Sequence, residues 1–184
     1  MINKDLFEAL LETTLKEDLG DGDHSSLACI PAGASGKAQL LVKDAGIIAG
    51  LDVTSLIYGR IDPGLKITFY LQDGDRIKSG DIGFLVSGRV HSILKSERIV
   101  LNVLQRMSGI ATQARSAVEE IAHTEAKILD TRKTAPGLRL LDKYAVQAGG
   151  AVNHRMGLYD AVMLKDTHLR AVPSITSAVR QAQA

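Results

Sequence analysis

Two adjacent cations, Arg132 and Lys133, stand between two threonines in the stretch 129–138. They follow a short β-prone run, residues 127–130, and precede Pro136-Gly137, where a new helix is expected to begin. Cations at a turn from strand to helix, beside a helix N-terminus, form a site for negative charge. The stretch therefore predicts an anion-binding turn.

Further cations follow at His154-Arg155 and at Lys165, which ends an apolar run. A histidine alone is more often structural, but beside Arg155 and after a glycine pair we interpret His154 as a substrate contact. In parallel sheets, sites lie at the C-terminal ends of the strands. Arg132, Lys133 and Lys165 are therefore expected at one rim. We expect Asp130 and Asp166 to orient nearby cations rather than bind a metal.

Composition limits the possible classes. The 184 residues are 45% hydrophobic and 23% charged, as in an ordinary soluble globular protein. No apolar run approaches the roughly 18 residues of a membrane span, and the N-terminus does not resemble a signal peptide. The single cysteine, Cys29, excludes an intramolecular disulfide and a cysteine-based zinc cluster. A cytoplasmic location, with no membrane association, is the expectation.

Charge is distributed unevenly along the chain. Residues 1–126 hold 13 Lys and Arg against 17 Asp and Glu, whereas residues 127–184 hold 9 against 4. This excess is too small for a nucleic-acid groove, and the basic part has only tyrosines, Tyr144 and Tyr159, for base stacking. The pattern favours a pocket for a small polyanion and excludes a nucleic-acid partner.

The first half of the chain reads as a small sandwich of helices and strands. Leucines at helical spacing predict a helix over 3–18, and the Asp, Gly and Ser residues within 21–26 predict a turn. Alternating and β-prone runs predict antiparallel strands over 37–43, 46–50 and 65–71, with turns at 72–75 and 79–81 and a short helix over 52–58.

A long helix then links the two halves. Apolar residues recur every three or four positions between Ser92 and Ala122, which predicts one helix buried along a stripe. Gly109 is expected to mark a bend or a break in it. Arg98 lies off the stripe, so its position alone indicates an exposed cation.

Alternating strands and helices follow. Strands are expected at 126–130 and 161–165, a β-prone segment before Asn153, and helices over 137–148 and from Pro173. The fold class is therefore α/β: an α+β sandwich with its linking helix over 1–110, then the first part of an α/β barrel over 111–184. A complete barrel takes about 250 residues, so we expect an incomplete, truncated polypeptide.

Several motifs resemble those of the quinolinate phosphoribosyltransferase family, also called nicotinate-nucleotide pyrophosphorylases (carboxylating). The most specific are Leu129-Asp-Thr-Arg-Lys-Thr-Ala-Pro-Gly-Leu-Arg139, Lys143-Tyr-Ala-Val146, Gly149-Gly-Ala-Val-Asn-His-Arg-Met-Gly-Leu158 and Met163-Leu-Lys-Asp166. Upstream, Glu17-Asp-Leu-Gly20, Ile47-Ile-Ala-Gly50, Ser96-Glu-Arg98 and Ser108-Gly-Ile-Ala-Thr112 are similar to the same family. Ala151 and Thr167 depart from its usual glycine and asparagine.

The resemblance implies a homodimeric enzyme with a shared active site. It would transfer phosphoribosyl from 5-phosphoribosyl-1-pyrophosphate to quinolinate with decarboxylation, giving nicotinate mononucleotide, pyrophosphate and CO2 in NAD biosynthesis. Mg2+ would be the cofactor, with ligands expected beyond residue 184. The residues implied to contact substrates are Arg98 from the neighbouring subunit, Thr131, Arg132, Lys133, His154, Arg155 and Lys165, of which Lys133 and Lys165 would be catalytic.

The chemistry agrees with this resemblance, and two alternatives stay open. Guanidinium groups bind adjacent carboxylates in bidentate fashion, and lysines and magnesium would stabilise a departing pyrophosphate. A paralogous phosphoribosyltransferase that uses nicotinate or is associated with molybdenum transport is one alternative. The other is a catalytically incomplete fragment that acts only in dimerisation or anion binding.

Overall fold

The computed structural model describes residues 4–184, which form two compact units. The first unit extends to Asn153 and the second runs from His154 to Ala184. Each unit is described by itself. No helix among the described residues is long and apolar enough to span a membrane.

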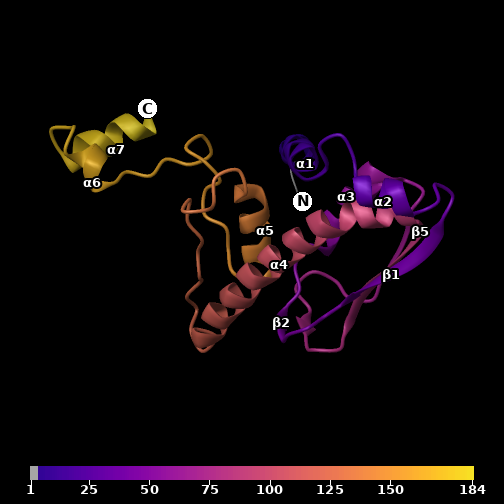
Figure 1. Ribbon diagram of the computed structural model, residues 1–184. Coiled ribbons are helices and arrows are strands. Elements are labelled where there is room, and N and C mark those ends of the chain that lie inside the picture. The colour runs from indigo at the N-terminus through magenta and orange to yellow at the C-terminus, as the bar shows by residue number, and fades with distance from the viewer. Residues whose placement is uncertain (1–3) are drawn as a thin grey trace. The chain divides into compact units, whose positions relative to one another are not determined.

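The first unit begins with the expected sandwich (Figure 1). A three-stranded antiparallel sheet has the order β1-β5-β3, and a two-stranded antiparallel sheet pairs β2 with β4. The strands are β1 (Ser35–Leu41), β2 (Gly46–Ile47), β3 (Lys66–Phe69), β4 (Arg76–Ile77) and β5 (Ile82–Arg89). The helices are α1 (Lys4–Leu19), α2 (His24–Cys29) and α3 (Leu51–Ile61).

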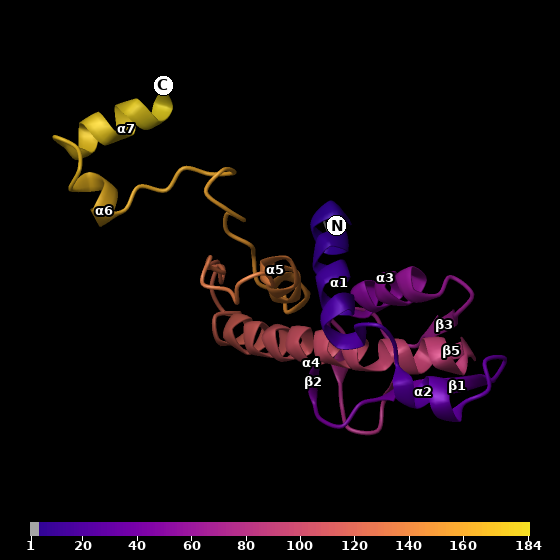
Figure 2. The ribbon, with the colours of Figure 1, turned by 45° about the horizontal axis from the view of Figure 1, so that its top comes forward.

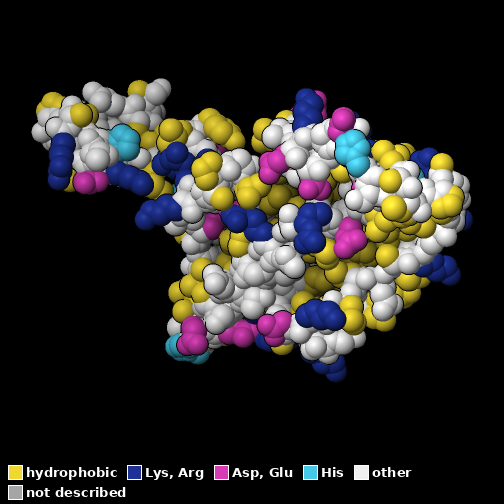
Figure 3. Space-filling view, in the orientation of Figure 1, with side chains coloured by type: hydrophobic (Ala, Val, Ile, Leu, Met, Phe, Trp, Pro, Cys, Tyr) yellow, Lys and Arg dark blue, Asp and Glu magenta, His cyan; other side chains and the backbone are white. Residues whose placement is uncertain are grey.

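The helices and strands named for this part are confirmed with small shifts of their ends, but β4 and the central strand β5 were not among them. Two further places differ. Residues 21–26 were expected to be a turn throughout, but α2 begins at His24 because the Asp23 carboxylate accepts a hydrogen bond from the Ser26 N–H at 3.1 Å. The predicted helix start at residue 3 lies outside the described residues. Apolar side chains also reach the surface over the sandwich, as Figure 3 shows for one face. Leu41, Phe69 and Ile82 are among its exposed hydrophobic residues.

Helix α4 (Val90–Glu120) is the long linking helix, and it contacts α1, α3, α5 and both sheets. Figure 2 shows it passing beneath α1 and continuing below α5. Its buried stripe includes Val100, Leu104, Met107 and Ala111, as the spacing predicts. A bend or a break was expected at Gly109; α4 runs through it as one helix, so the expectation of a break was wrong. A glycine's helix cost of about 1 kcal/mol is small beside the burial of this stripe.

The barrel part of the first unit contains α5 (Arg139–Ala148) but no extended strand among its described residues. The strand predicted at 126–130 is reduced to one parallel bridge, Leu129 to Val152. The bridge is formed by the Asp130 N–H to the Val152 carbonyl at 3.1 Å and the Val152 N–H to the Ile128 carbonyl at 2.9 Å. This is the first step of a strand–helix–strand unit.

The Tyr144 side chain connects helix α5 to the sandwich. The Tyr144 hydroxyl lies 2.9 Å from Asp52 Oδ2 and 2.8 Å from Asp73 Oδ2. Burial, with these two carboxylates, raises the pKa of Tyr144. Asp73 also accepts the Leu51 N–H at 2.8 Å, so one carboxylate joins the start of α3 to α5.

The second unit holds α6 (Asp166–Leu169) and α7 (Ile175–Gln183). Ser174 caps α7, accepting the Ser177 N–H at 3.1 Å, so the helix begins just after Pro173 as predicted. No strand forms at 161–165 in the described structure, and that prediction was wrong. An extended segment becomes a strand only when a neighbour pairs with it, and the described residues supply no pairing there.

Candidate functional site

Residues Asp130–Ala135, named here the cationic loop, connect the parallel bridge to α5. Within it the Thr131 hydroxyl accepts the Lys133 N–H at 3.0 Å, which closes a local turn. Arg139, the first residue of α5, folds back onto the loop and donates to Thr134 Oγ1 at 3.1 Å and to the Arg132 carbonyl at 3.3 Å. Both threonines thus shape the backbone around the two cations.

The start of the cationic loop is held by a buried ion pair. Asp130 lies 2.6 Å from Lys143 Nζ of α5, and their side chains are 6% and 1% exposed. With its amide oriented by the hydrogen-bond network, Asn153 donates to Asp130 Oδ2 at 2.8 Å and to the Lys143 carbonyl at 2.9 Å. The expectation that Asp130 orients a cation is confirmed, and the cation is Lys143.

The end of the cationic loop is held by a second pair. Arg106 of α4 donates two hydrogen bonds to Asp142 of α5, at 2.7 and 2.8 Å. Asp142 also accepts the Ala135 N–H at 3.3 Å. The Asp142 carboxylate, through these hydrogen bonds, raises the pKa of Arg106.

A cavity of about 340 Å³ opens beside the cationic loop. Three cations and two carboxylates contribute to its walls: Arg106, Lys133, Lys143, Asp130 and Asp142. Thr131 and Thr134 also line it. Because both carboxylates already bind a cation, Lys133 supplies the uncompensated charge. Arg132 does not line the cavity; its Nε is buried and has no hydrogen-bond partner among the described residues.

His154 and Arg155 lie in the second unit, in a loop closed by its own hydrogen bonds. His154 Nδ1 accepts the Arg155 N–H at 2.7 Å, and Arg155 donates to the Ala161 carbonyl at 2.9 Å. Asp160 accepts the N–H groups of Met156 and Gly157 at 2.6 and 2.8 Å. One guanidinium N–H of Arg155 shapes the loop, and a guanidinium has five.

Lys165 and Arg98 are both exposed. Lys165 has an extended backbone and directly precedes α6, where its N–H bonds His168 Nδ1 at 3.1 Å. Arg98 lies on α4, eight residues before Arg106, hence about 12 Å along the helix axis from it. The structure therefore brings Thr131, Arg132 and Lys133 together in the first unit and His154 with Arg155 in the second.

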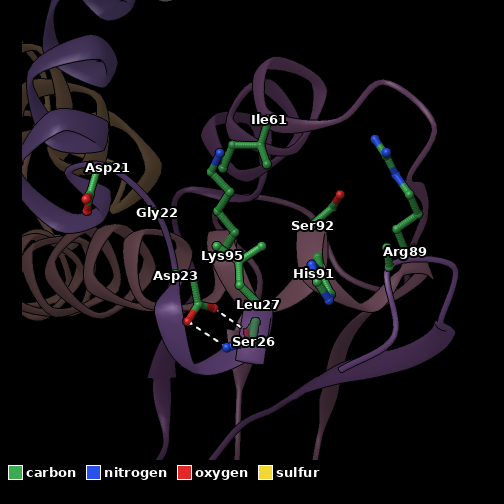
Figure 4. A pocket seen from close by; sticks show the side chains of 11 residues that line it. Asp21, Gly22, Asp23, Ser26, Leu27, Ile61, Arg89, His91, Ser92 and Lys95 are labelled. Atoms are coloured by element: carbon green, nitrogen blue, oxygen red, sulfur yellow. Dashed lines mark hydrogen bonds between the residues drawn. The ribbon is translucent and has the colours of Figure 1, made fainter. Parts of the chain in front are cut away.

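Another cavity, of about 460 Å³, lies between α2 and the start of α4 (Figure 4). Three of the polar side chains in its wall already have partners. Arg89 pairs with Asp62 at 2.9 Å, Asp23 caps α2, and His91 Nε2 lies 2.9 Å from the Ile30 carbonyl. These contacts hold the sandwich together, and we assign this cavity no ligand.

Sequence reasoning missed Arg106, Asp142, Lys143 and Asn153. Lys143 was recognised as part of a motif but was given no role, and Arg106 was hidden within a long helix. Asp142 and Lys143 stand between Leu141 and Ala145 in the sequence, but consecutive helix residues point about 100° apart. The apolar spacing of α5 therefore gave no signal that either charged side chain is buried, and buried charges need partners.

Two family models match the chain. The quinolinate phosphoribosyl transferase N-terminal domain matches residues 23–108, and the C-terminal domain of the same family matches residues 110–184. The two matches adjoin inside α4, so the cationic loop, His154, Arg155 and Lys165 all belong to the C-terminal match.

Known proteins show the same likeness. Quinolinate phosphoribosyltransferase (decarboxylating) 1b of Nicotiana tabacum is 46% identical over 173 residues, which is 94% of this chain and 49% of that protein. The probable nicotinate-nucleotide pyrophosphorylase (carboxylating) of Bacillus subtilis is 42% identical, over 95% of this chain and 60% of that protein. This chain therefore spans about half the length of the curated relatives it matches.

A solved structure supports the fold. NadC from Streptococcus pyogenes superposes with a TM-score of 0.93 at 39% identity, covering all of this chain and 65% of that one. The likeness confirms the expected α/β fold class, including the part in which few strands form.

Proposed function

The chain belongs to the quinolinate phosphoribosyltransferase family, and we propose that it carries that activity. The protein transfers phosphoribosyl from 5-phosphoribosyl-1-pyrophosphate to quinolinate with loss of CO2, yielding nicotinate mononucleotide and pyrophosphate for NAD biosynthesis. It acts in the cytoplasm, in keeping with its single, unpaired cysteine.

The unpaired donor of Arg132 at the cationic loop carries this proposal. Its Nε is buried with no partner among the described residues, and an unsatisfied buried donor is costly unless a ligand binds it. Quinolinate has two adjacent carboxylates, and each suits a guanidinium. Arg132 binds one carboxylate, and the family resemblance assigns the other carboxylate to Arg155, with His154 next to it in the sequence.

Lys133 and Lys165 act on the phosphoribosyl donor. The Lys133 side chain lines the cavity, and Thr131 holds its backbone N–H. The pyridine nitrogen attacks the anomeric carbon, the bond from that carbon to pyrophosphate breaks, and lysine ammonium groups stabilise the charge on the leaving group. The positive charge of the pyridinium nitrogen then stabilises the carbanion left on the adjacent ring carbon when the carboxylate departs as CO2, and that carbon takes a proton from solvent to give the product.

Magnesium stays a prediction. Residues 4–184 contain no group of three or more histidine, cysteine or acidic side chains that could hold a metal. The two carboxylates that line the cavity, Asp130 and Asp142, are held by Lys143 and Arg106. The described residues therefore do not form a magnesium site, and we derive no step through the ion.

The homodimer with a shared site is also part of the proposal. Arg98 is exposed and lies about 12 Å along α4 from Arg106, which suits a side chain that serves a second subunit. Arg98→Ala and Arg155→Ala proteins, each inactive alone, regain activity on co-refolding if Arg98 completes the partner's site. No recovery in dimers shown by mass spectrometry to be mixed would contradict this arrangement.

Calorimetric titration of the purified protein with quinolinate and with nicotinate tests the substrate. The second carboxylate should add about 1.5–3 kcal/mol of charge-assisted bonding, so quinolinate should bind about 10–150-fold more tightly. Arg132→Ala should remove most of that preference. Equal affinities would favour a nicotinate-using paralogue. If the protein binds quinolinate but forms no nicotinate mononucleotide when 5-phosphoribosyl-1-pyrophosphate is added, an anion-binding role alone would be favoured.

A further inference from the structure

We propose that Asp142 and Lys143, consecutive residues of α5, are positioning residues that hold the two ends of the cationic loop. They fix the backbone that presents Arg132 and Lys133 to an anionic ligand. The identity of that ligand as quinolinate rests on the proposed function, but the fixing of the loop does not.

The first end is held through a charge pair that is almost removed from water. Lys143 Nζ lies 2.6 Å from Asp130 Oδ1, and the Asn153 amide bonds Asp130 Oδ2 at 2.8 Å. Removing one partner of such a pair leaves an uncompensated buried charge. Moving the Asp130 side chain away from Lys143 would therefore cost free energy. The Asp130 backbone is also held, because its N–H donates to the Val152 carbonyl at 3.1 Å.

The second end is held by a carboxylate with three donors. Asp142 binds Arg106 through both oxygens and accepts the Ala135 N–H. A bidentate guanidinium pair fixes the orientation of the carboxylate as well as its position. Ala135 is thereby connected to α5 and, through Arg106, to the long helix α4.

The same two pairs remove unwanted negative charge from the cavity. Asp130 and Asp142 line it together with Lys133. Unpaired, they would repel a carboxylate or phosphate at short range, where screening is weak. Paired with Lys143 and Arg106, they leave the cavity with an excess of positive charge.

Stability alone does not account for these charges. Replacing a buried ion pair by apolar residues is often neutral or stabilising, and Leu141 and Ala145 already supply an apolar face to α5. Consecutive helix residues point about 100° apart, so one turn of α5 reaches two separate points on the loop. Two adjacent residues of opposite charge thus hold a carboxylate at one end and a backbone N–H at the other.

Two variants and one matched control test the proposal in the isotopically labelled chain. Asp142→Asn weakens the second contact. Asp130→Asn with Lys143→Met removes the first contact as a neutral pair, which avoids leaving one buried charge. The control is Asp62→Asn in the sandwich. Asp62 likewise binds an arginine, Arg89, at 2.9 Å and a backbone N–H, that of Gly64, at 2.9 Å.

Amide exchange at Asp130 and Ala135, urea unfolding and calorimetry with quinolinate are measured on each protein. Both loop variants should exchange about tenfold faster or more at the affected end, and their Kd should rise about tenfold or more. The control should lose stability with both loop readouts unchanged. Unchanged exchange and Kd in the loop variants, or equal changes in the control, would overturn the proposal. If the parent protein fails to bind quinolinate, the proposed function fails, and the exchange data alone decide the positioning role.

Discussion

Residues 4–153 and residues 154–184 differ in what their apolar side chains contact. In the first unit, side chains from α1, the sheets, α3, α4 and α5 meet in one core, where Val86, Met107 and Ala145 are fully buried. Among the described residues of the second unit, Ala178 is the only buried hydrophobic residue. Leu158 and Tyr159 there are 71% and 80% exposed.

This difference between the two units shows that a helix can form without a neighbouring element, whereas a strand cannot. Helix α7 forms in the second unit because a helix contains its own backbone hydrogen bonds and Ser174 caps it. The β-prone run 161–165 in the same unit stays unpaired because a strand takes its hydrogen bonds from a neighbour. Exposed apolar positions in the second unit therefore indicate a sequence that suits a sheet but forms none here.

The largest expected effect comes from shortening one apolar side chain in each unit. Met107→Ala, at a side chain with 0% exposure in the core of the first unit, should cost about 2–5 kcal/mol in urea unfolding. Val162→Ala, at a residue 72% exposed in the second unit, should change stability by less than about 0.5 kcal/mol. Similar losses from both changes would show that the second unit has a core comparable to the first.

A pair of glycines sharpens the comparison within the first unit. A Cβ on Gly149 would lie 2.5 Å from the Ala111 carbonyl and 2.7 Å from Ala114 Cβ, so Gly149→Ala forces α5 away from α4 and should cost about 1–3 kcal/mol. A Cβ on Gly109 meets nothing within 4 Å, so Gly109→Ala should stabilise by about 1 kcal/mol. Thermal unfolding of both variants measures the contrast, and a loss at Gly109 would mean that its bare face of α4 is covered in solution.

Local signals predicted the first unit well. Spacing of apolar residues located α1, α3 and the long α4, because each buries a stripe against a partner within the same unit. The expected break at Gly109 was wrong since packing on both sides of it outweighs the cost of one glycine. The strands predicted at 126–130 and 161–165 were wrong because a β-prone run becomes a strand only beside another strand that takes its hydrogen bonds. Among these residues only Leu129 has such a partner, Val152.

The sequence predicted the cations of the candidate site but not the residues that hold the cationic loop in place. Arg132, Lys133 and Thr131 stand in one short stretch, so their proximity follows from the sequence itself. Arg106 reaches Asp142 across 36 positions, and such long-range partners cannot be read from periodicity. Lys143, with 1% exposure, looks like any helix lysine until its burial beside Asp130 is known.

The smallest expected effect comes from removing a helix N-cap, and the chain offers two caps that make the same kind of hydrogen bond. Asp23 and Ser174 each accept the N–H of the residue three positions later, at 3.1 Å. Ser174→Ala should cost about 1 kcal/mol, seen as lost helical signal of α7 with unchanged urea unfolding of the first unit. Asp23→Ala should instead lower the unfolding midpoint of the first unit, because α2 packs on α4 there.

Acid separates the two caps further. The hydrogen bonds from Ser26 lower the pKa of Asp23. A carboxyl whose pKa is lower in the folded state stabilises the fold above its ordinary pKa, about 3.9, and loses that contribution as the pH falls through the folded value. The difference between the parent and Asp23→Ala should therefore shrink below about pH 4, whereas the Ser174→Ala difference should not, because a hydroxyl does not titrate in this range. A pH-independent gap for Asp23→Ala, measured by urea unfolding from pH 7 to pH 3, would show that its carboxylate charge adds nothing to the cap.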